Sequence, residues 1–427
     1  MTVIAVILLL LLAASGIYVA AVLGLVSVIL GEAFSFLPLM PSLGTVSWGA
    51  SSNFLLVAVP LFILMGEILL RTGIAADMFN ALDKWVNWIP GGLMHTNVAS
   101  TALFAATTGS SVATAATIGT VAVPNIEKHG YGPSLFLGSL AAGGTLGILI
   151  PPSISIIIYA FLTDSSVNDL YLAAMIPGFS LAVMFSVAIY IACKINPSLS
   201  GTRDKADWSQ RIRALPHLLP PIILFMVVIG SIYIGIATPT EAASLGVVAS
   251  LIFGFSRKRI NLEVLKRSFE GTMKTTAMVL LIVVVAHFLN FVLQTIGATQ
   301  FISDFMDNLG LNPYVAIVLI IAFYLVLGMF MEGLTLITVT TPIVVPVILA
   351  LGFDQIWFGI VFVILIEASL ITPPIGINLF VVQAVRGKGE FRDVVIGSLP
   401  FLIMMIGMIF LLLLFPGIAM WLPNLLN

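Results

Sequence analysis

The chain has 427 residues, of which 60% are hydrophobic and only 8% are charged. Soluble domains carry about 25% charged residues, so this composition excludes a soluble globular protein and predicts a helical protein that crosses a membrane many times. A formal net charge of −2 gives no reason to expect nucleic acid as a partner, and the single cysteine, Cys193, excludes an internal disulfide and a cysteine-rich metal site.

Apolar stretches long enough to span a bilayer, which takes roughly 20 residues, follow one another along the chain. They lie at 2–30, 53–71, 133–162, 173–194, 215–236, 240–255, 276–296, 356–385 and 394–422. The first has no basic segment before it and is about thirty residues long, so it predicts a spanning helix and not a cleaved signal peptide.

Two further regions, 96–129 and 314–350, each contain two apolar arms around a polar or glycine-containing tip. The arm from Thr96 to Ala106 is too short to cross, and arms of about 10–14 residues suit re-entrant segments. We therefore expect two re-entrant helical hairpins. Residues 75–88 and 300–309 predict amphipathic helices that lie in the membrane interface.

The basic residues support this topology. If the N-terminus lies on one side and each hairpin returns to the side it entered, all 17 Lys and Arg residues fall on the N-terminal side. The opposite side receives only acids, such as Glu32, Asp164, Asp169, Asp304, Asp307 and Asp354. By the positive-inside rule the N-terminus is cytoplasmic, and the span count places the C-terminus on the opposite side of the membrane.

The two halves of the sequence align at a constant shift of 222 positions. Pro151-Pro152 matches Pro373-Pro374, and Ser110 falls opposite Glu332. Because five spans precede the second copy of the first helix, an odd number, the copies point in opposite directions. An inverted-topology repeat predicts a substrate and ion site near the midplane, at the interface of the repeats.

Four segments interrupt apolar sequence with glycine, hydroxyl residues or paired prolines: 107–114, 149–153, 328–335 and 371–376. Broken helices at membrane depth survive only where they line a site or cavity. Their N-termini suit anions, and their unwound carbonyls and hydroxyls suit Na⁺. The alternative is that these small residues have no role in binding and simply let the helices pack closely.

We expect two Na⁺ sites, one in each half, and no organic cofactor. The expected metal ligands are Thr107, Ser110, Gly147, Pro151, Glu332, Gly333, Thr335, Thr372 and Pro374. Glu332 and Glu367 are acids within the membrane and are candidates for ion or proton binding. We interpret His287 as a packing residue, Glu67 and Arg71 as a structural pair, and Glu241 as a helix cap.

The pattern corresponds to five regions. Residues 1–95 hold scaffold helices and the first arm helix, 96–172 one half of a transport domain, 173–313 linking and scaffold helices with the second arm, 314–393 the other transport half, and 394–427 a C-terminal transmembrane helix. The sequence has no Gly-x-Ser-x-Gly, His-Glu-x-x-His or Walker motif. We therefore expect no enzyme, and transport driven by an ion gradient.

Several runs resemble the large membrane subunit of the tripartite ATP-independent periplasmic (TRAP) transporters, of the DctM and SiaM type. They are Gly109–Thr120, Leu140–Ser153, Val59–Phe62, Pro90–Leu93, Thr238–Ala243 and Ile371–Asn378. The resemblance covers nearly the whole chain. It implies a protein of the bacterial inner membrane, with the C-terminus in the periplasm.

The resemblance implies an elevator-type transporter of the ion-transporter superfamily that takes up an organic acid, such as a sialic acid or a C4-dicarboxylate, with Na⁺. It implies a periplasmic binding protein that delivers the substrate and a small four-helix membrane subunit, here expected as a separate chain. The expected substrate contacts are Ser110, Ser111, Thr114, Pro152, Ser153, Gly333, Thr335 and Asn378. Proton coupling, a one-component symporter, a passive channel and a membrane scaffold remain as alternatives.

Overall fold

The computed structural model describes residue 8 and residues 17–36, 38–202, 206–298, 300 and 312–426, with the backbone alone for 105–108. Within these ranges the chain is helical and forms no strand apart from one isolated bridge between Tyr131 and Ser200. Seven of the described helices are long and apolar enough to cross a membrane, and a bent pair adds an eighth span. The predicted all-α polytopic membrane protein is confirmed.

The helices up to the first long connection are α2 (Val19–Phe34), α3 (Ser42–Ser51), η1 (Phe54–Val57), α4 (Ala58–Arg71), α5 (Ile74–Val86), α6 (Leu93–Thr108), α7 (Ser111–Ala122), α8 (Asn125–His129), α9 (Pro133–Leu149), α10 (Ile154–Thr163) and α11 (Val167–Ile195). After the short η2 (Pro197–Leu199) follow α12 (Trp208–Tyr233), α13 (Pro239–Ser256), α14 (Leu262–Thr295), α16 (Pro313–Leu327), α17 (Gly333–Ala350), α18 (Gln355–Ser369), α19 (Ile377–Arg386), α20 (Phe391–Leu414) and α21 (Gly417–Leu426).

The shift of 222 positions that relates the sequence halves also relates these helices. It carries the first residue of α7 onto that of α17, and the first residue of α9 onto that of α18. The bonds Pro151-Pro152 and Pro373-Pro374, related by the same shift, are both cis. Helix α12 lies between the two copies in the sequence. The internal repeat is therefore a property of the fold as well as of the sequence.

The two repeats interlock, because helices of each repeat pack against helices of the other. Helix α7 of the first repeat packs against α19 of the second, and α17 of the second packs against α10 of the first. In the same way α9 packs against α20, and α18 against α11. Each tip and each proline break is therefore held by helices of both halves.

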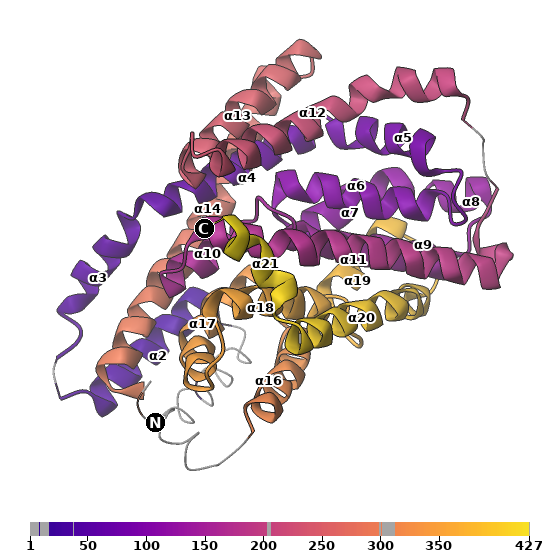
Figure 1. The fold of residues 1–427 in the computed structure, drawn as a ribbon. Coiled ribbons are helices and arrows are strands. Elements are labelled where there is room, and N and C mark those ends of the chain that lie inside the picture. Colours follow the sequence, from indigo (N-terminus) through magenta and orange to yellow (C-terminus); the bar gives the residue numbers. More distant parts are fainter. Residues whose placement is uncertain are drawn as a thin grey trace.

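Figure 1 shows that the helices are arranged in successive layers. Helices α5, α12 and α13 lie along one side, α18 and α20 lie along the opposite side, and α6, α7, α9 and α11 lie between them. Helix α12 contacts both α5 and α13, and α13 also packs on α4. These four helices form a layer beside the interlocked helices of the two repeats.

Two predicted spans have different boundaries. Residues 17 and 18 are not helical, so the predicted span 2–30 is wrong as one helix, and α2 begins at Val19. Serine and glycine at positions 15 and 16, both poorer helix formers than alanine, precede this interruption. The predicted span 394–422 is also wrong as one helix, because α20 ends at Leu414 and α21 begins at Gly417. Pro416 explains this break, since the residue before a proline is disfavoured in helical geometry.

Helix α14 is much longer than the predicted span 276–296. The first turns of the helix carry the charged residues Glu263, Lys266, Arg267, Glu270 and Lys274. Because these charges lower the local hydropathy, the apolar pattern did not predict this part of the helix. Two ion pairs stabilise this polar part, each between residues four positions apart: Arg267 with Glu263 at 2.6 Å and Lys266 with Glu270 at 4.0 Å.

The predicted amphipathic helix 75–88 exists as α5. It buries Met78, Phe79 and Leu82, while Trp88 beyond its end is 64% exposed. The second predicted arm, 300–309, lies outside the described residues apart from Gln300.

Candidate functional site

The first tip is the turn between α6 and α7. Gly109 there has a φ of +60°, which favours glycine, and a Cβ at this position would lie 3.1 Å from the Ile154 side chain. Ser110 is the N-cap of α7, and its side chain accepts a hydrogen bond from the Ala113 N–H at 3.4 Å. The tip is therefore pressed against the start of α10, just after the first proline break.

The first proline break removes hydrogen bonds from α9. An α-helical carbonyl bonds the N–H four residues later, and Pro151 and Pro152 have no N–H. The carbonyls of Gly147 and Ile148 therefore lose their helical donors. Ser153 then caps α10 by accepting from the Ile156 N–H at 3.4 Å. These carbonyl oxygens are available to a cation.

The second tip is the start of α17. Glu332 is its N-cap, and the carboxylate accepts a hydrogen bond from the Thr335 N–H at 3.2 Å. A Cβ on Gly333 would lie 3.3 Å from Ile366 and 3.7 Å from Ile148. The second tip therefore lies between α18 and the last turn of α9.

The second proline break is more fully satisfied than the first. Pro373 and Pro374 likewise remove the helical donors of the Ser369 and Leu370 carbonyls. The Leu370 carbonyl instead accepts from the Asn378 N–H at 3.1 Å, and the Ser369 carbonyl from the Thr372 N–H at 3.1 Å. The two breaks are thus related in sequence but unequal in hydrogen bonding.

A buried polar contact joins the two halves beside the first tip. The Ser111 hydroxyl, in the first turn of α7, lies 2.8 Å and 2.7 Å from the two carboxyl oxygens of Glu367 on α18. Glu367 is 1% exposed and forms no ion pair with any described residue. The positions related by the repeat are Gly333 and Thr145, so this contact occurs once and makes the halves chemically different.

The predicted site residues differ in accessibility. Thr114, Ser153 and Asn378 are fully buried, as are Pro151 and Pro152, so a ligand reaches them only when the packing around them opens. The more accessible predicted ligands are Ser110, Glu332, Thr335 and Thr372, which are partly exposed, and Pro374, which is exposed. The Thr107 side chain lies outside the described part of the structure.

Asn378 has an unused acceptor. Its side-chain Nδ2 lies 3.5 Å from the Ala141 carbonyl, but its buried Oδ1 has no hydrogen-bond partner among the described residues. Buried polar atoms are nearly always paired with protein, water or an ion. An oxygen of this kind, beside α9, fits a cation that prefers oxygen ligands.

The described residues contain no group of three or more His, Cys, Asp or Glu side chains placed to hold a metal. Zinc and similar metals prefer such nitrogen, sulfur and carboxylate ligands. The oxygens available at the breaks, from carbonyls, hydroxyls and one amide, suit Na⁺ better.

Sequence reasoning identified the four segments but missed the Ser111–Glu367 contact and left Glu367 out of the ligand set. The available signal was an acid within the apolar run 356–370. Two smaller predictions are confirmed. Arg71 pairs with Glu67 at 2.7 Å, and Glu241 forms a capping box with Thr238 at the start of α13.

His287 lies on α14, outside the four segments. Its ring is 5.3 Å from that of Phe161. This contact is what a packing residue would make.

Comparison with known proteins agrees with this architecture. The family described as "Tripartite ATP-independent periplasmic transporter, DctM component" matches residues 4–418. The C4-dicarboxylate TRAP transporter large permease protein DctM of Pseudomonas aeruginosa is 33% identical over 376 residues, which is 88% of this chain and 87% of that protein. The sialic acid large permease protein SiaM of Vibrio cholerae is 31% identical, with 88% of both chains covered.

A third relative has a different substrate. The ectoine TRAP transporter large permease protein TeaC of Halomonas elongata is 33% identical, over 87% of this chain and 86% of its own. Among solved structures, the YdaH transporter of Alcanivorax borkumensis is similar with a TM-score of 0.68, covering 94% of this chain and 97% of that one, at 14% identity. That similarity concerns the fold alone. On the match over nearly its whole length, the chain belongs to the DctM family, the large permease component of TRAP transporters.

Proposed function

We propose that this chain carries an organic acid across the bacterial inner membrane together with Na⁺. The substrate would be of the C4-dicarboxylate or sialic acid class, as in two of the relatives. A zwitterion such as ectoine is a further candidate on the strength of the third. The observation that carries the proposal is the convergence of two helix tips and two proline breaks in the interlocked centre of the repeats.

The cation would bind among oxygens that the helices leave unused. The Gly147 and Ile148 carbonyls lose their donors to Pro151 and Pro152, and the buried Asn378 Oδ1 has no partner among the described residues. Such oxygens can replace the hydration shell of Na⁺ only if they converge on it. We therefore propose the two Na⁺ sites at the tips and proline breaks, which the packing of the helices brings together.

The two tips differ in the charge of their caps, and this difference suggests which tip holds the substrate. Ser110 and Ser153 are neutral caps, so the positive ends of α7 and α10 are left for an anion. Glu332 places a carboxyl group at the start of α17, where it would repel an anionic substrate. We therefore place the substrate nearer the first tip and a cation nearer Glu332.

The movement would be of the elevator type. Helix α7 packs against α19, and α10 packs against α17. Because these contacts join the transport halves, 96–172 and 314–393, the two halves would move as one body. The layer of α4, α5, α12 and α13 would stay in the membrane as scaffold. A small four-helix membrane subunit, as a separate chain, would brace this scaffold, and a periplasmic binding protein would deliver the substrate. The N-terminus would lie in the cytoplasm and the C-terminus in the periplasm.

The function is tested by uptake into proteoliposomes that contain this chain and its small subunit, with the binding protein outside. Labelled succinate, sialic acid and ectoine are offered with an inward Na⁺ gradient, and then with K⁺ in place of Na⁺. Accumulation that needs both Na⁺ and the binding protein is the expected result. Accumulation without the binding protein would instead indicate a one-component symporter, and equilibration without accumulation would indicate a channel.

The second candidate is proton coupling, which the burial of Glu367 favours. A carboxylate without a cationic partner is costly to bury, so a proton or another cation is needed there. Glu332→Gln and Glu367→Gln, each measured for uptake at several pH values, separate the two cases. Uptake that needs no Na⁺ but fails in the Glu367→Gln variant would replace Na⁺ coupling by proton coupling.

A further inference from the structure

A tyrosine of α11, outside the four interrupted segments, contacts the first proline break. The Tyr171 hydroxyl accepts a hydrogen bond from the Ser153 N–H at 3.3 Å and donates one to the Ser153 carbonyl, also at 3.3 Å. Both residues are fully buried. One hydroxyl therefore satisfies both backbone groups of the residue that caps α10.

This contact also keeps α9 from continuing into α10. In an uninterrupted helix the Ser153 N–H would donate to the Leu149 carbonyl, four residues earlier. Tyr171 takes that N–H instead, and no other described backbone N–H donates to the Leu149 carbonyl. The two prolines remove two helical hydrogen bonds at the break, and Tyr171 removes a third.

A glycine further along α11 allows this helix to approach the other side of the break. Gly178 lies seven positions after Tyr171, which places both residues on one face of α11. A Cβ on Gly178 would lie 3.2 Å from the Ile150 side chain and 3.4 Å from the Leu149 side chain. Helix α11 therefore contacts the chain both before and after the two prolines.

The second break has no tyrosine at the related position, because the shift of 222 positions carries Tyr171 onto Asp393. There the Leu370 carbonyl accepts from the Asn378 N–H, across the prolines. The related N–H in the first half, that of Ile156, donates to a side chain instead. Among the described residues no bond between backbone groups spans the first pair of prolines, and the tyrosine holds this break from outside.

The position of Ser153 also affects the first tip. The next residue, Ile154, packs against this tip, since a Cβ on Gly109 would lie 3.1 Å from the Ile154 side chain. The start of α10 is one of the two positive helix ends that we propose for the substrate anion. A change in the orientation of Ser153 would therefore alter the start of α10 and the tip that packs on it.

We propose that Tyr171 and Gly178 are positioning residues that hold the first proline break in the shape that binds the substrate anion. Tyr171 acts through Ser153, and Gly178 acts through Leu149 and Ile150. The inference rests on the proposed substrate site at the start of α10. It extends that site to α11, a helix that the sequence predicts only as a linking span.

The first test compares Tyr171→Phe with Tyr159→Phe in Na⁺-driven uptake into proteoliposomes. Tyr159 is a buried tyrosine of α10 whose hydroxyl donates to the Gln355 carbonyl at 2.8 Å, away from the break. The probe is whichever of labelled succinate, sialic acid and ectoine the wild type accumulates. Tyr171→Phe should raise the KM for this substrate about ten-fold. Tyr159→Phe should leave the KM unchanged, because a smaller amount of folded protein lowers only the maximal rate.

Gly178→Ala tests the same role without removing a hydrogen bond. Its methyl group would press on Ile150 and Leu149, so the KM should rise here as well. The matched control is Gly407→Ala on α20, where a Cβ would have no atom within 4 Å. This control should keep the wild-type KM.

Hydrogen–deuterium exchange of the purified full chain tests the positioning without any substrate. Peptides that cover residues 150–157 should exchange faster in Tyr171→Phe than in the wild type, because the Ser153 N–H loses its acceptor. The same peptides should exchange at the wild-type rate in Tyr159→Phe.

Two results would overturn the proposal. An unchanged KM in Tyr171→Phe, beside a wild type that accumulates substrate with Na⁺, would show that the tyrosine does not position the substrate site. Wild-type exchange at 150–157 in Tyr171→Phe would show that the hydroxyl does not hold the break. A wild type that accumulates none of the three substrates would refute the proposed function and the substrate role of Tyr171 with it, whereas faster exchange would still show that the hydroxyl holds the break.

Discussion

The contact between the Ser111 hydroxyl and the Glu367 carboxyl group is buried and joins the two repeats. Ser111→Ala leaves a buried carboxyl group without its partner, which should cost about 1–3 kcal/mol and lower the thermal unfolding midpoint. Glu367→Gln keeps a group that can bond the hydroxyl and should cost less.

Ser155 provides the matched control for Ser111→Ala. It is also a buried serine, but its hydroxyl has no hydrogen-bond partner among the described residues. Ser155→Ala should therefore leave the midpoint unchanged or raise it slightly. If both serine variants melt like the wild type, the Ser111–Glu367 contact does not stabilise the protein.

An exposed ion pair gives a pH-dependent prediction outside the membrane. The hydrogen bond and charge of Lys388 lower the pKa of Glu127 on α8 from its ordinary value of 4.5. A carboxyl group whose pKa is lower in the folded protein stabilises the fold above its ordinary pKa, and this contribution is lost as the pH falls toward the lowered value.

The measurement is the unfolding midpoint of the wild type and of Glu127→Gln between pH 6 and pH 3. The wild type should be slightly more stable at pH 6, and the difference should shrink as the pH falls below 4.5 through the lowered pKa of Glu127, and also in high salt. A difference that is the same at pH 6 and pH 3 would rule out the carboxylate as its source.

At the scale of elements, we expect the largest effect on transport when the first proline break is removed. Pro151→Ala/Pro152→Ala restores the N–H donors for the Gly147 and Ile148 carbonyls, so α9 can continue toward α10. We expect a folded protein with no uptake in proteoliposomes. Pro216→Ala restores one donor in the peripheral helix α12 and should retain uptake. Wild-type uptake by the double variant would refute the assignment of the site to this break.

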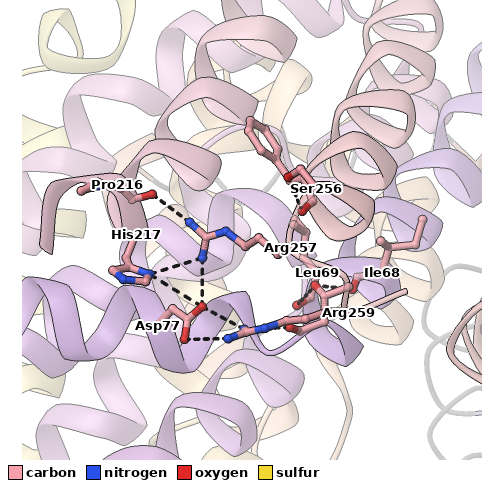
Figure 2. A network of polar contacts seen from close by, with 10 residues as sticks. Ile68, Leu69, Asp77, Pro216, His217, Ser256, Arg257 and Arg259 are labelled. Carbon is pink, nitrogen blue, oxygen red and sulfur yellow. Dashed lines mark hydrogen bonds and ion pairs between the residues drawn. The ribbon is translucent and has the colours of Figure 1, made fainter. Parts of the chain in front are cut away.

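Asp77 of α5 lies between two guanidinium groups, 2.9 Å from Arg257 Nη1 and 2.8 Å from Arg259 Nη1 (Figure 2). This clamp of three charged side chains gives a second prediction at this scale. Asp77→Asn removes the charge that holds Arg257 and Arg259 and should cost about 2 kcal/mol, because hydrogen bonds to charged groups are worth about 1.5–3 kcal/mol. Glu270→Gln breaks an exposed pair at 4.0 Å and should cost under about 1 kcal/mol. Equal midpoints for the two variants would show that the clamp contributes no more than a surface pair.

The elements also show what the sequence could and could not predict. The tips and breaks were predictable because Gly109, Pro151 and Pro373 act through local backbone geometry. The first half of α14 was not predicted, because its charges mask a helix held by its own ion pairs and by packing. The contact between Ser111 and Glu367 joins residues 256 positions apart, and no local pattern encodes such a pairing.

For the whole molecule, the main consequence of the repeat is a pair of related but unequal half-sites. The backbone breaks are repeated at Pro151-Pro152 and Pro373-Pro374, while the polar groups differ: Ser110 opposite Glu332, and Thr145 opposite Glu367. A symmetric scaffold with unequal charges can hold a cation and an anion close together. Binding of one would then favour binding of the other, since neither site contains a neutralising Lys or Arg among the described residues.

The most direct test of Na⁺ binding by the broken helices is the thermal stability of the purified chain in NaCl and in KCl at equal ionic strength. A ligand that binds only the folded state stabilises it by about 2.7 kcal/mol at 100 times its Kd. We predict a midpoint that rises with Na⁺ and saturates, does not rise with K⁺, and loses this dependence in Pro151→Ala/Pro152→Ala. Equal midpoints in the two salts up to molar concentration would contradict the Na⁺ sites.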